Sequence, residues 1–128
     1  MGWFSSKKNK DNNLSRGKVN WIPLTEMSQL DEIKETSKTT PVMILKHSTR
    51  CSVSLMAKNT LDRNWDIEDD KIKTYYLDLL KFRPISNQIV EEFNIRHQSP
   101  QILLIKNGVC DYTTTHSNID ARAIKQNL

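Results

Sequence analysis

Cysteine is scarce in this chain, which has only Cys51 and Cys110 among its 128 residues. Two cysteines argue against the disulfide framework that stabilises many small secreted domains. Long apolar runs are also lacking, and none approaches the roughly 20 residues that a membrane-spanning helix needs. With 37% hydrophobic residues and a mean hydropathy of −0.62, the composition is that of a soluble protein, and we expect no membrane partner.

A secretory signal is missing from the start of the chain, because such a signal needs a continuous apolar segment and the opening is polar after four residues. We therefore expect a cytoplasmic protein. Gly2 and Ser6 fit the loose pattern for N-myristoylation, and basic residues follow them. That pattern is short and often matches by chance, so a solvated, flexible leader is the preferred interpretation.

The body of the chain has no excess of positive charge. The net charge is +4, and residues 1–18 supply all of it, while the other residues carry fourteen basic and fourteen acidic side chains. Because a nucleic-acid-binding domain displays basic residues on its folded surface, we expect no nucleic-acid partner. We predict a basic leader over residues 1–18 and one domain over residues 19–128, long enough to bury a modest core.

Strand-like and helix-like patterns alternate after this leader. A continuous apolar run over Val42–Lys46 is typical of a strand buried on both faces, and Pro23 predicts that the first strand lies at a sheet edge. Asn107-Gly108 is a strong two-residue hairpin signal. The predicted strands are Val19–Leu24, Val42–Lys46, Ile72–Leu80, Gln101–Lys106 and Val109–Thr115, and the predicted helices are Thr25–Lys38, Cys51–Trp65, one starting near Pro84, and one from Ile119 to the end.

This order predicts an α/β fold, with a central mixed sheet, a C-terminal β-hairpin and helices on both faces. We expect Thr25 to cap the first helix and Met27 to lie on its core face. We expect the second helix to pack Val53, Met56 and Leu61 against the core.

Cys51 follows a buried strand and a short polar turn, and it stands at the predicted start of a helix. The thiolate is the nucleophilic form of cysteine, and the positive end of a helix favours it. Reactive groups in open α/β sheets gather beyond the carboxyl ends of the parallel strands, where this thiol lies. We therefore predict that Cys51 is a nucleophile.

The same edge of the sheet should hold Ser99 and Pro100, because they open a strand that runs antiparallel to the preceding ones. An X-Pro bond there can be cis, and Pro100 would shape a backbone edge that receives an extended substrate. Counting back from the hairpin turn places Ile105 beside Cys110 and Ser99 beside His116. We therefore expect His116 near the proline and near the reactive thiol.

Cys110 falls at the opposite end of the hairpin, about 15 Å or more from Cys51 at roughly 3.3 Å per strand residue. A disulfide needs α-carbons within roughly 7 Å, so we interpret Cys110 as a small core residue. The same separation argues against one metal site built from both cysteines, His47 and His116, and we predict no bound metal.

Several polar residues around the thiol have two interpretations. Thr49 and Ser52 hydrogen-bond the sulfur or the substrate, or they only cap the turn and the helix. Arg50 favours the thiolate of Cys51, binds a ligand carboxylate or is an exposed turn residue without function. His116 orients the substrate, donates a proton or has no role. We interpret His47 as a satisfied core histidine rather than a functional one.

Position 54 separates this chain from dithiol redox proteins. A Cys-x-x-Cys motif would place its second cysteine there, but this chain has Ser54. Without a second thiol near Cys51 the usual intramolecular disulfide cannot form. The sequence therefore predicts a one-cysteine mechanism, in which Ser54 has a supporting role.

The segment Leu45–Ser54, with the sequence LKHSTRCSVS, resembles the active-site segment of the YtxJ-like monothiol bacilliredoxins of the bacillithiol system. A strand, a thiol at a helix start and a proline that opens the next strand also look like a thioredoxin-like fold. The similarity spans about Val19 to Asn127. Shorter matches within it are Trp21–Thr25, Ser99–Ile102, Lys106–Gly108 and Thr115-His116.

This resemblance implies a cytoplasmic thiol–disulfide oxidoreductase that removes bacillithiol from protein mixed disulfides, with Cys51 as its reactive cysteine. It implies bacillithiolated client proteins and a low-molecular-weight thiol as partners, bacillithiol as the thiol co-substrate, and no permanently bound cofactor. Arg50 would pair with a carboxylate of bacillithiol's malate portion. We expect the protein to be a monomer.

Other functions stay open at the level of sequence. The domain is alternatively a thioredoxin-fold binding or adaptor module whose Cys51 is regulatory or inert, or a glutaredoxin-like enzyme that uses another low-molecular-weight thiol. Some monothiol glutaredoxins share an iron–sulfur cluster between two protomers, but one cysteine per chain would need further ligands from elsewhere.

Overall fold

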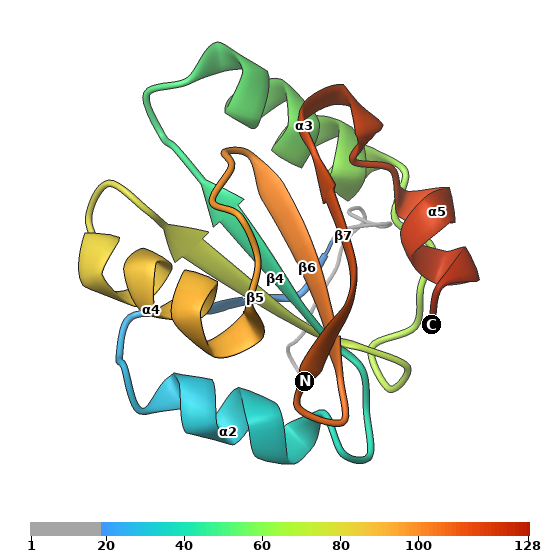
Figure 1. Cartoon of the computed structure of the whole chain (residues 1–128). Helices are drawn as coiled ribbons and strands as arrows, with labels where there is room; N and C mark the ends of the chain where they lie inside the picture. Colours follow the sequence, from blue (N-terminus) through green and yellow to red (C-terminus); the bar gives the residue numbers. More distant parts are fainter. Residues whose placement is uncertain (1–18) are drawn as a thin grey trace, which may run out of the picture.

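The computed structural model describes residues 19–128, and the predicted leader with its N-myristoylation pattern lies outside the described residues. The elements are β3 (Trp21–Pro23), α2 (Gln29–Thr36), β4 (Val42–His47), α3 (Ser52–Arg63), β5 (Lys73–Asp78), α4 (Arg83–Phe93), β6 (Gln101–Lys106), β7 (Val109–Thr115), the 3-10 helix η1 (His116–Asn118) and α5 (Ala121–Gln126) (Figure 1). Within the described chain, no helix is both long and apolar enough to cross a lipid bilayer.

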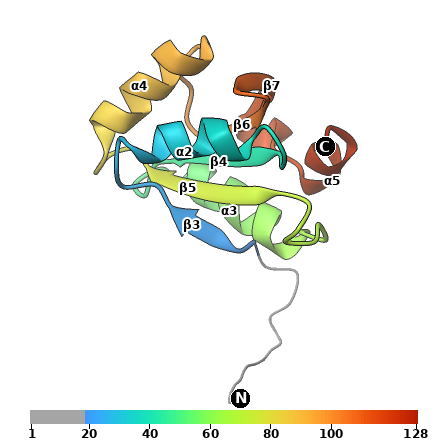
Figure 2. The ribbon, with the colours of Figure 1, turned by 90° about the horizontal axis from the view of Figure 1, so that it is seen from below.

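One mixed sheet of five strands, in the order β3-β5-β4-β6-β7, forms the centre of the molecule. Strands β3 and β4 both run parallel to β5, whereas β6 is antiparallel to β4 and to β7. Helices α2 and α4 cover one face of this sheet and α3 covers the other (Figure 2). This arrangement confirms the predicted α/β fold, its C-terminal hairpin and the edge position of the first strand.

Strand β4 contributes to both layers of the core, and all six of its residues are buried. Val42 and Ile44 pack in the layer under α2 and α4, while Met43 and Leu45 pack in the layer under α3 and α5. Burying one such aliphatic side chain contributes about 1.5–3 kcal/mol. The apolar run therefore gives the sheet a central strand that is fixed from both sides, as predicted.

The first helix begins later than predicted, at Gln29 instead of Thr25. The side chain of Gln29 accepts hydrogen bonds from the backbone N–H groups of Thr25 (2.8 Å) and Glu26 (2.9 Å). These bonds hold residues 25–28 in a turn, so Thr25 does not cap the helix. Met27 lies on that turn and is exposed, not in the core as predicted.

The second helix begins as predicted but buries a different set of side chains. Val53 and Met56, expected in the core, are 47% and 70% exposed. Ser54 and Leu61 are the buried residues of α3. Because consecutive helix residues are turned by about 100°, a helix that directs Ser54 at the sheet turns Val53 and Met56 away from it.

The hairpin contains a β-bulge that shifts the predicted register by one residue. Lys106 pairs with Val109 and Ile105 with Cys110, as predicted, but Leu104 pairs with Tyr112. Asp111 is therefore the extra residue. From there on each partner lies one position further along β7 than the sequence predicted.

Asp62 of α3 fastens the start of the described chain to the core. Its Oδ1 atom accepts hydrogen bonds from the backbone N–H of Val19 (3.2 Å) and from the indole N–H of Trp21 (3.1 Å). Its Oδ2 atom pairs with Lys58 at 3.2 Å. One partly buried carboxylate therefore holds the edge strand β3 against α3.

We predict that Asp62→Ala lowers the free energy of unfolding by about 1–3 kcal/mol, because two donors and one cation lose their acceptor. Chemical denaturation measures this change. Asp66→Ala is the matched control, since Asp66 pairs with Lys125 where both side chains are more than half exposed, and it should change stability by about 0.5 kcal/mol or less. Equal effects of the two substitutions would contradict the anchoring role of Asp62.

Candidate functional site

The site begins where β4 ends and turns into α3, in the loop at the upper left of Figure 1. The backbone N–H of Cys51 donates to the carbonyl of Ser48 at 3.2 Å, which closes a tight turn. Cys51 is the N-cap of α3, with φ −108° and ψ 121°, and its carbonyl accepts from the N–H of Leu55 at 3.0 Å. The predicted thiol at a helix start is therefore confirmed, and its side chain makes no capping hydrogen bond.

Exposed polar residues surround this thiol. Cys51 itself is partly exposed, while Thr49, Arg50 and Ser52 are exposed. Two hydroxyl groups and one guanidinium group therefore lie one or two positions from Cys51 in the sequence, where a ligand can reach them from solvent. Their predicted substrate-binding roles stay predictions.

Ser54 and His47 form a buried hydrogen-bonded pair beneath the turn. Ser54 is fully buried and His47 is 2% exposed. The Oγ atom of Ser54 lies 2.6 Å from Nδ1 of His47 and accepts from the N–H of Ser48 at 3.1 Å. The serine at the position of a second thiol thus joins the helix, the strand end and the turn.

The charge state of His47 follows from its surroundings. Burial lowers the pKa of His47, the nearby Lys58 lowers it further, and Asp78 opposes the shift. A neutral imidazole accepts at one nitrogen. The lowered pKa favours the neutral imidazole, and the Ser54 hydroxyl can pair with Nδ1 in either ring tautomer.

The second side of the site is the start of β6. Gln101 pairs with Lys46 of β4, so the preceding residues lie at the edge where Cys51 lies. The Ser99–Pro100 peptide bond is cis, and Pro100 is buried while Ser99 is partly exposed.

His116 also lies at this edge, as predicted. Its backbone N–H donates to the carbonyl of Pro100 at 3.1 Å, so His116 is beside Pro100 and not beside Ser99. The one-residue bulge in β7 causes this difference. His116 is exposed and has φ +53° in the left-handed region, which turns the chain from β7 into η1.

Cys110 lies at the far end of the hairpin, next to the turn, as predicted. It pairs with Ile105 and packs partly buried against the α2/α4 layer of the core. Its Sγ atom donates to the carbonyl of Tyr112 at 3.4 Å, and burial raises the pKa of its thiol. Neither cysteine is in a disulfide. Within residues 19–128, no group of three or more histidine, cysteine or acidic residues could hold a metal ion.

Sequence reasoning missed Lys46, which it counted only as the end of an apolar strand. Lys46 is 0% exposed. Its Nζ atom donates to Nδ1 of His97 at 2.8 Å and to the carbonyl of Ser86 at 3.4 Å. Burial, assisted by the charge of Arg83, lowers the pKa of Lys46 to about 8. The available signal was a lysine that directly follows four apolar residues in a strand predicted to be buried on both faces.

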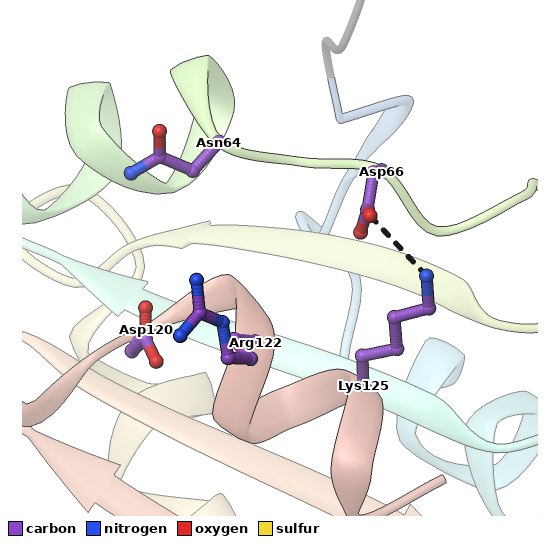
Figure 3. A pocket seen from close by; sticks show the side chains of 5 residues that line it. All are labelled: Asn64, Asp66, Asp120, Arg122 and Lys125. Atoms are coloured by element: carbon purple, nitrogen blue, oxygen red, sulfur yellow. Dashed lines mark hydrogen bonds and ion pairs between the residues drawn. The ribbon is translucent and has the colours of Figure 1, made fainter.

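Two cavities adjoin α3. One of about 240 Å³ lies between η1 and the part of α3 from Val53 to Thr60, and Met56 and His116 also line it. The other, of about 520 Å³, is polar and is drawn in Figure 3; it includes the Asp66–Lys125 ion pair. Since a helix rises 1.5 Å per residue, the twelve residues of α3 place about 18 Å between its start, where Cys51 lies, and its end, where Asn64 lines the polar cavity. The polar cavity is therefore not part of the thiol site.

Comparison with known families agrees with this geometry. The family model for the monothiol bacilliredoxin BrxC matches residues 22–124. The chain belongs to the monothiol bacilliredoxin family. The match includes the thiol turn, the cis-proline segment and the hairpin, and it confirms the resemblance that the sequence segments indicated.

Solved structures similar to this bacilliredoxin have the thioredoxin fold. A thioredoxin-fold protein assigned as an oxidoreductase has a TM-score of 0.72 and 27% identity, over 84% of this chain and 92% of its own. The Malassezia sympodialis thioredoxin has a TM-score of 0.63 and 23% identity over 87% and 88%. Thioredoxin f from spinach chloroplast has a TM-score of 0.64 and 13% identity over 89% and 98%. The two thioredoxins show the fold, while the family match and the 27% identical protein support a thiol oxidoreductase.

We predict that iodoacetamide at neutral pH modifies Cys51 at least about tenfold faster than Cys110. The first thiol is accessible at a helix start, whereas the second is partly buried and burial raises its pKa. Peptide mass spectrometry over time measures both rates. Cys110→Ala should keep the fast modification and Cys51→Ala should lose it, and faster labelling of Cys110 would contradict the assignment.

We predict that His47 makes the bacilliredoxin less stable below about pH 6.5. In the unfolded chain His47 binds a proton near its ordinary pKa of 6.5. In the folded state the pKa is lowered, so His47 binds the proton only at a lower pH. The free energy of unfolding therefore falls as the pH drops from 7 to 5, and this contribution is fully present above that range.

The substitution His47→Asn isolates this effect from the rest of the protein, including His97, whose pKa is also lowered. The asparagine amide retains a hydrogen-bonding group near the position of Nδ1 but does not titrate. Urea unfolding at pH 7 and pH 5 should show a smaller loss of stability in the variant than in the wild type. Equal losses would show that His47 does not resist protonation.

Proposed function

We propose that this bacilliredoxin removes bacillithiol from protein mixed disulfides, with Cys51 as its single nucleophile, and that it does so in the cytoplasm. The main support is one observation: an accessible thiol caps α3, and three residues later a buried hydroxyl stands where a dithiol enzyme has its second thiol. The family match agrees with the choice of a one-cysteine mechanism.

The proposed reaction consists of two thiol–disulfide exchanges. The Cys51 thiolate attacks the bacillithiol sulfur of a modified client, the sulfur–sulfur bond of the client breaks, and the client cysteine leaves as a thiolate that takes a proton from water. A disulfide between Cys51 and bacillithiol remains. A second low-molecular-weight thiolate then attacks the bacillithiol sulfur, which releases Cys51 and forms a disulfide of two small thiols.

Neighbouring residues receive distinct roles in this proposal. The exposed Arg50 pairs with a carboxylate of bacillithiol, while Thr49 and Ser52 donate hydrogen bonds to the sulfur or the bound thiol. The Ser99–Pro100 segment receives the extended chain of the client. His116, held beside Pro100 by its own backbone N–H, orients the substrate from the other side.

The position of Ser54 explains why the mixed disulfide persists until a small thiol arrives. Its Oγ atom is occupied by the N–H of Ser48 and by His47, and its side chain faces the sheet. No internal thiol near residue 54 competes for the Cys51 sulfur. Release of bacillithiol therefore depends on a thiol that comes from solvent.

We predict that bacillithiol disulfide forms one adduct per protein, on Cys51, and that a small thiol removes it. Intact-mass spectrometry followed by peptide mapping measures this. The adduct should persist in Cys110→Ala and be absent in Cys51→Ala. An adduct found only on Cys110 would contradict the proposed mechanism.

The choice of small thiol needs a direct comparison. One client protein is prepared with either bacillithiol or glutathione on the same cysteine, and the rate of release by the bacilliredoxin is measured for each. Faster release of bacillithiol supports the proposal. Equal or faster release of glutathione favours the glutaredoxin-like alternative, and no release of either, with no adduct, favours the adaptor alternative.

A further inference from the structure

Lys46 is the largest fully buried side chain among residues 19–128. Its two hydrogen-bond partners are an imidazole and a backbone carbonyl, and neither is a carboxylate. Burying an amine without an acidic partner costs free energy, and an apolar side chain of similar length would fill the space without that cost. The two hydrogen bonds of its amine therefore account for a lysine at this buried position.

Those contacts join three separate parts of the molecule. Lys46 belongs to β4, the strand that leads into Cys51. Ser86 belongs to the first turns of α4, and His97 belongs to residues 94–100, the segment that leads to Pro100. The amine thus connects the strand of the nucleophile with the segment of the cis-proline.

A second residue holds the same segment from the neighbouring strand. The side-chain amide of Gln101 donates to the carbonyl of Arg96 at 3.0 Å, and its oxygen accepts from the N–H of Gln98 at 3.1 Å. Gln101 and Lys46 are direct partners in the β4–β6 register. One pair of facing residues therefore fixes the segment at three successive positions, 96, 97 and 98.

We propose that Lys46 is a positioning residue for thiol exchange: through His97 it fixes the segment 94–100, so that the Ser99–Pro100 edge stays in register with Cys51. This inference rests on the proposed function, because it assigns the edge to the client chain. It predicts a role in the binding of the client and no role in the reactivity of the sulfur.

The protonation states of Lys46 and His97 are consistent with a hydrogen bond in which Lys46 is the donor and His97 the acceptor. Burial, together with the charges of Lys46 and Arg83, lowers the pKa of His97, so the ring is neutral near pH 7. A neutral His97 with its proton on Nε2 accepts at Nδ1, and Lys46 is the donor. Arg83 of α4 lowers the pKa of both groups.

The test is the substitution Lys46→Met, which keeps the length of the side chain and removes its hydrogen bonds. The KM for a bacillithiolated client should rise about tenfold, in line with the loss of one hydrogen bond from a charged group. Alkylation of Cys51 by iodoacetamide should change less than about twofold, because that small reagent does not use the Ser99–Pro100 edge. A purely structural effect would raise the KM and slow the alkylation of Cys51 together.

His97→Ala provides a second variant at an exposed residue, so the test does not depend on the folding of Lys46→Met. It should raise the KM in the same way. The double variant should be no worse than the more affected single variant, because both substitutions break one contact. Additive effects would show that Lys46 and His97 act separately and would contradict the proposal.

Lys106→Met is the matched control, since it removes a lysine that also binds a backbone carbonyl. Lys106 donates to the carbonyl of Asn127 at 2.7 Å and pairs with Asp111 at 3.1 Å, at the other end of β6. It should leave the KM unchanged. A KM that rises equally in this control would attribute the effect to general destabilisation.

The outcomes separate the two proposals. A wild-type protein that does not release bacillithiol refutes the proposed function. A wild-type protein that releases it, with an unchanged KM in Lys46→Met and His97→Ala, refutes only the positioning role. Slower alkylation of Cys51 in parallel with slower exchange would also refute it, because Lys46 would then act on the sulfur.

Discussion

The structure of the site depends on two buried polar side chains at the end of one strand. Lys46 and His47 close β4 and, as neighbours in a strand, point to opposite faces of the sheet. A buried polar group without a partner costs about 1–3 kcal/mol, so each requires one. His47 has Ser54 of α3 on one face, and Lys46 has His97 on the other. The need to satisfy these groups ties both sides of the site to the same strand.

Ser54 illustrates how a single substitution separates two mechanisms on one fold. A thiol at this position would be a weak hydrogen-bond partner for His47 and for the N–H of Ser48. A hydroxyl is small and has one donor and two acceptor positions, and so it satisfies both groups in the buried space under the turn. The absence of the second thiol is therefore coupled to a stabilised turn that presents Cys51.

Local patterns predicted the parts of the fold that local interactions decide. The strand–turn–helix around Cys51, the Asn107-Gly108 turn and the fully buried β4 follow from short-range sterics and from apolar composition. The position of Cys110 far from Cys51 followed from strand geometry alone. These features needed no knowledge of the partners that each segment meets in three dimensions.

The features that sequence reasoning missed are decided by tertiary contacts. Helical periodicity groups Val53, Met56 and Leu61 but does not show which way the helix is rotated, and the Ser54–His47 bond sets that rotation. The bulge at Asp111 places Cys110 in one core layer and Tyr112 in the other, a result of packing on both sides of the sheet. Lys46 was overlooked because its partner His97 lies 51 residues away.

A one-cysteine mechanism makes a demand that a two-cysteine mechanism does not. In the proposed mechanism another thiol from solvent removes the bound small thiol, so the sulfur on Cys51 needs an open approach after the client has left. The residues around it match this demand, because Thr49, Arg50 and Ser52 are exposed and so are the apolar side chains of Val53 and Met56. The buried hydrogen bonds of Ser54 hold the turn that carries Cys51. The opposite side of this turn is exposed, so a thiol from solvent can reach the sulfur. The same buried contacts that stabilise the strand end thus allow the surface above it to remain open.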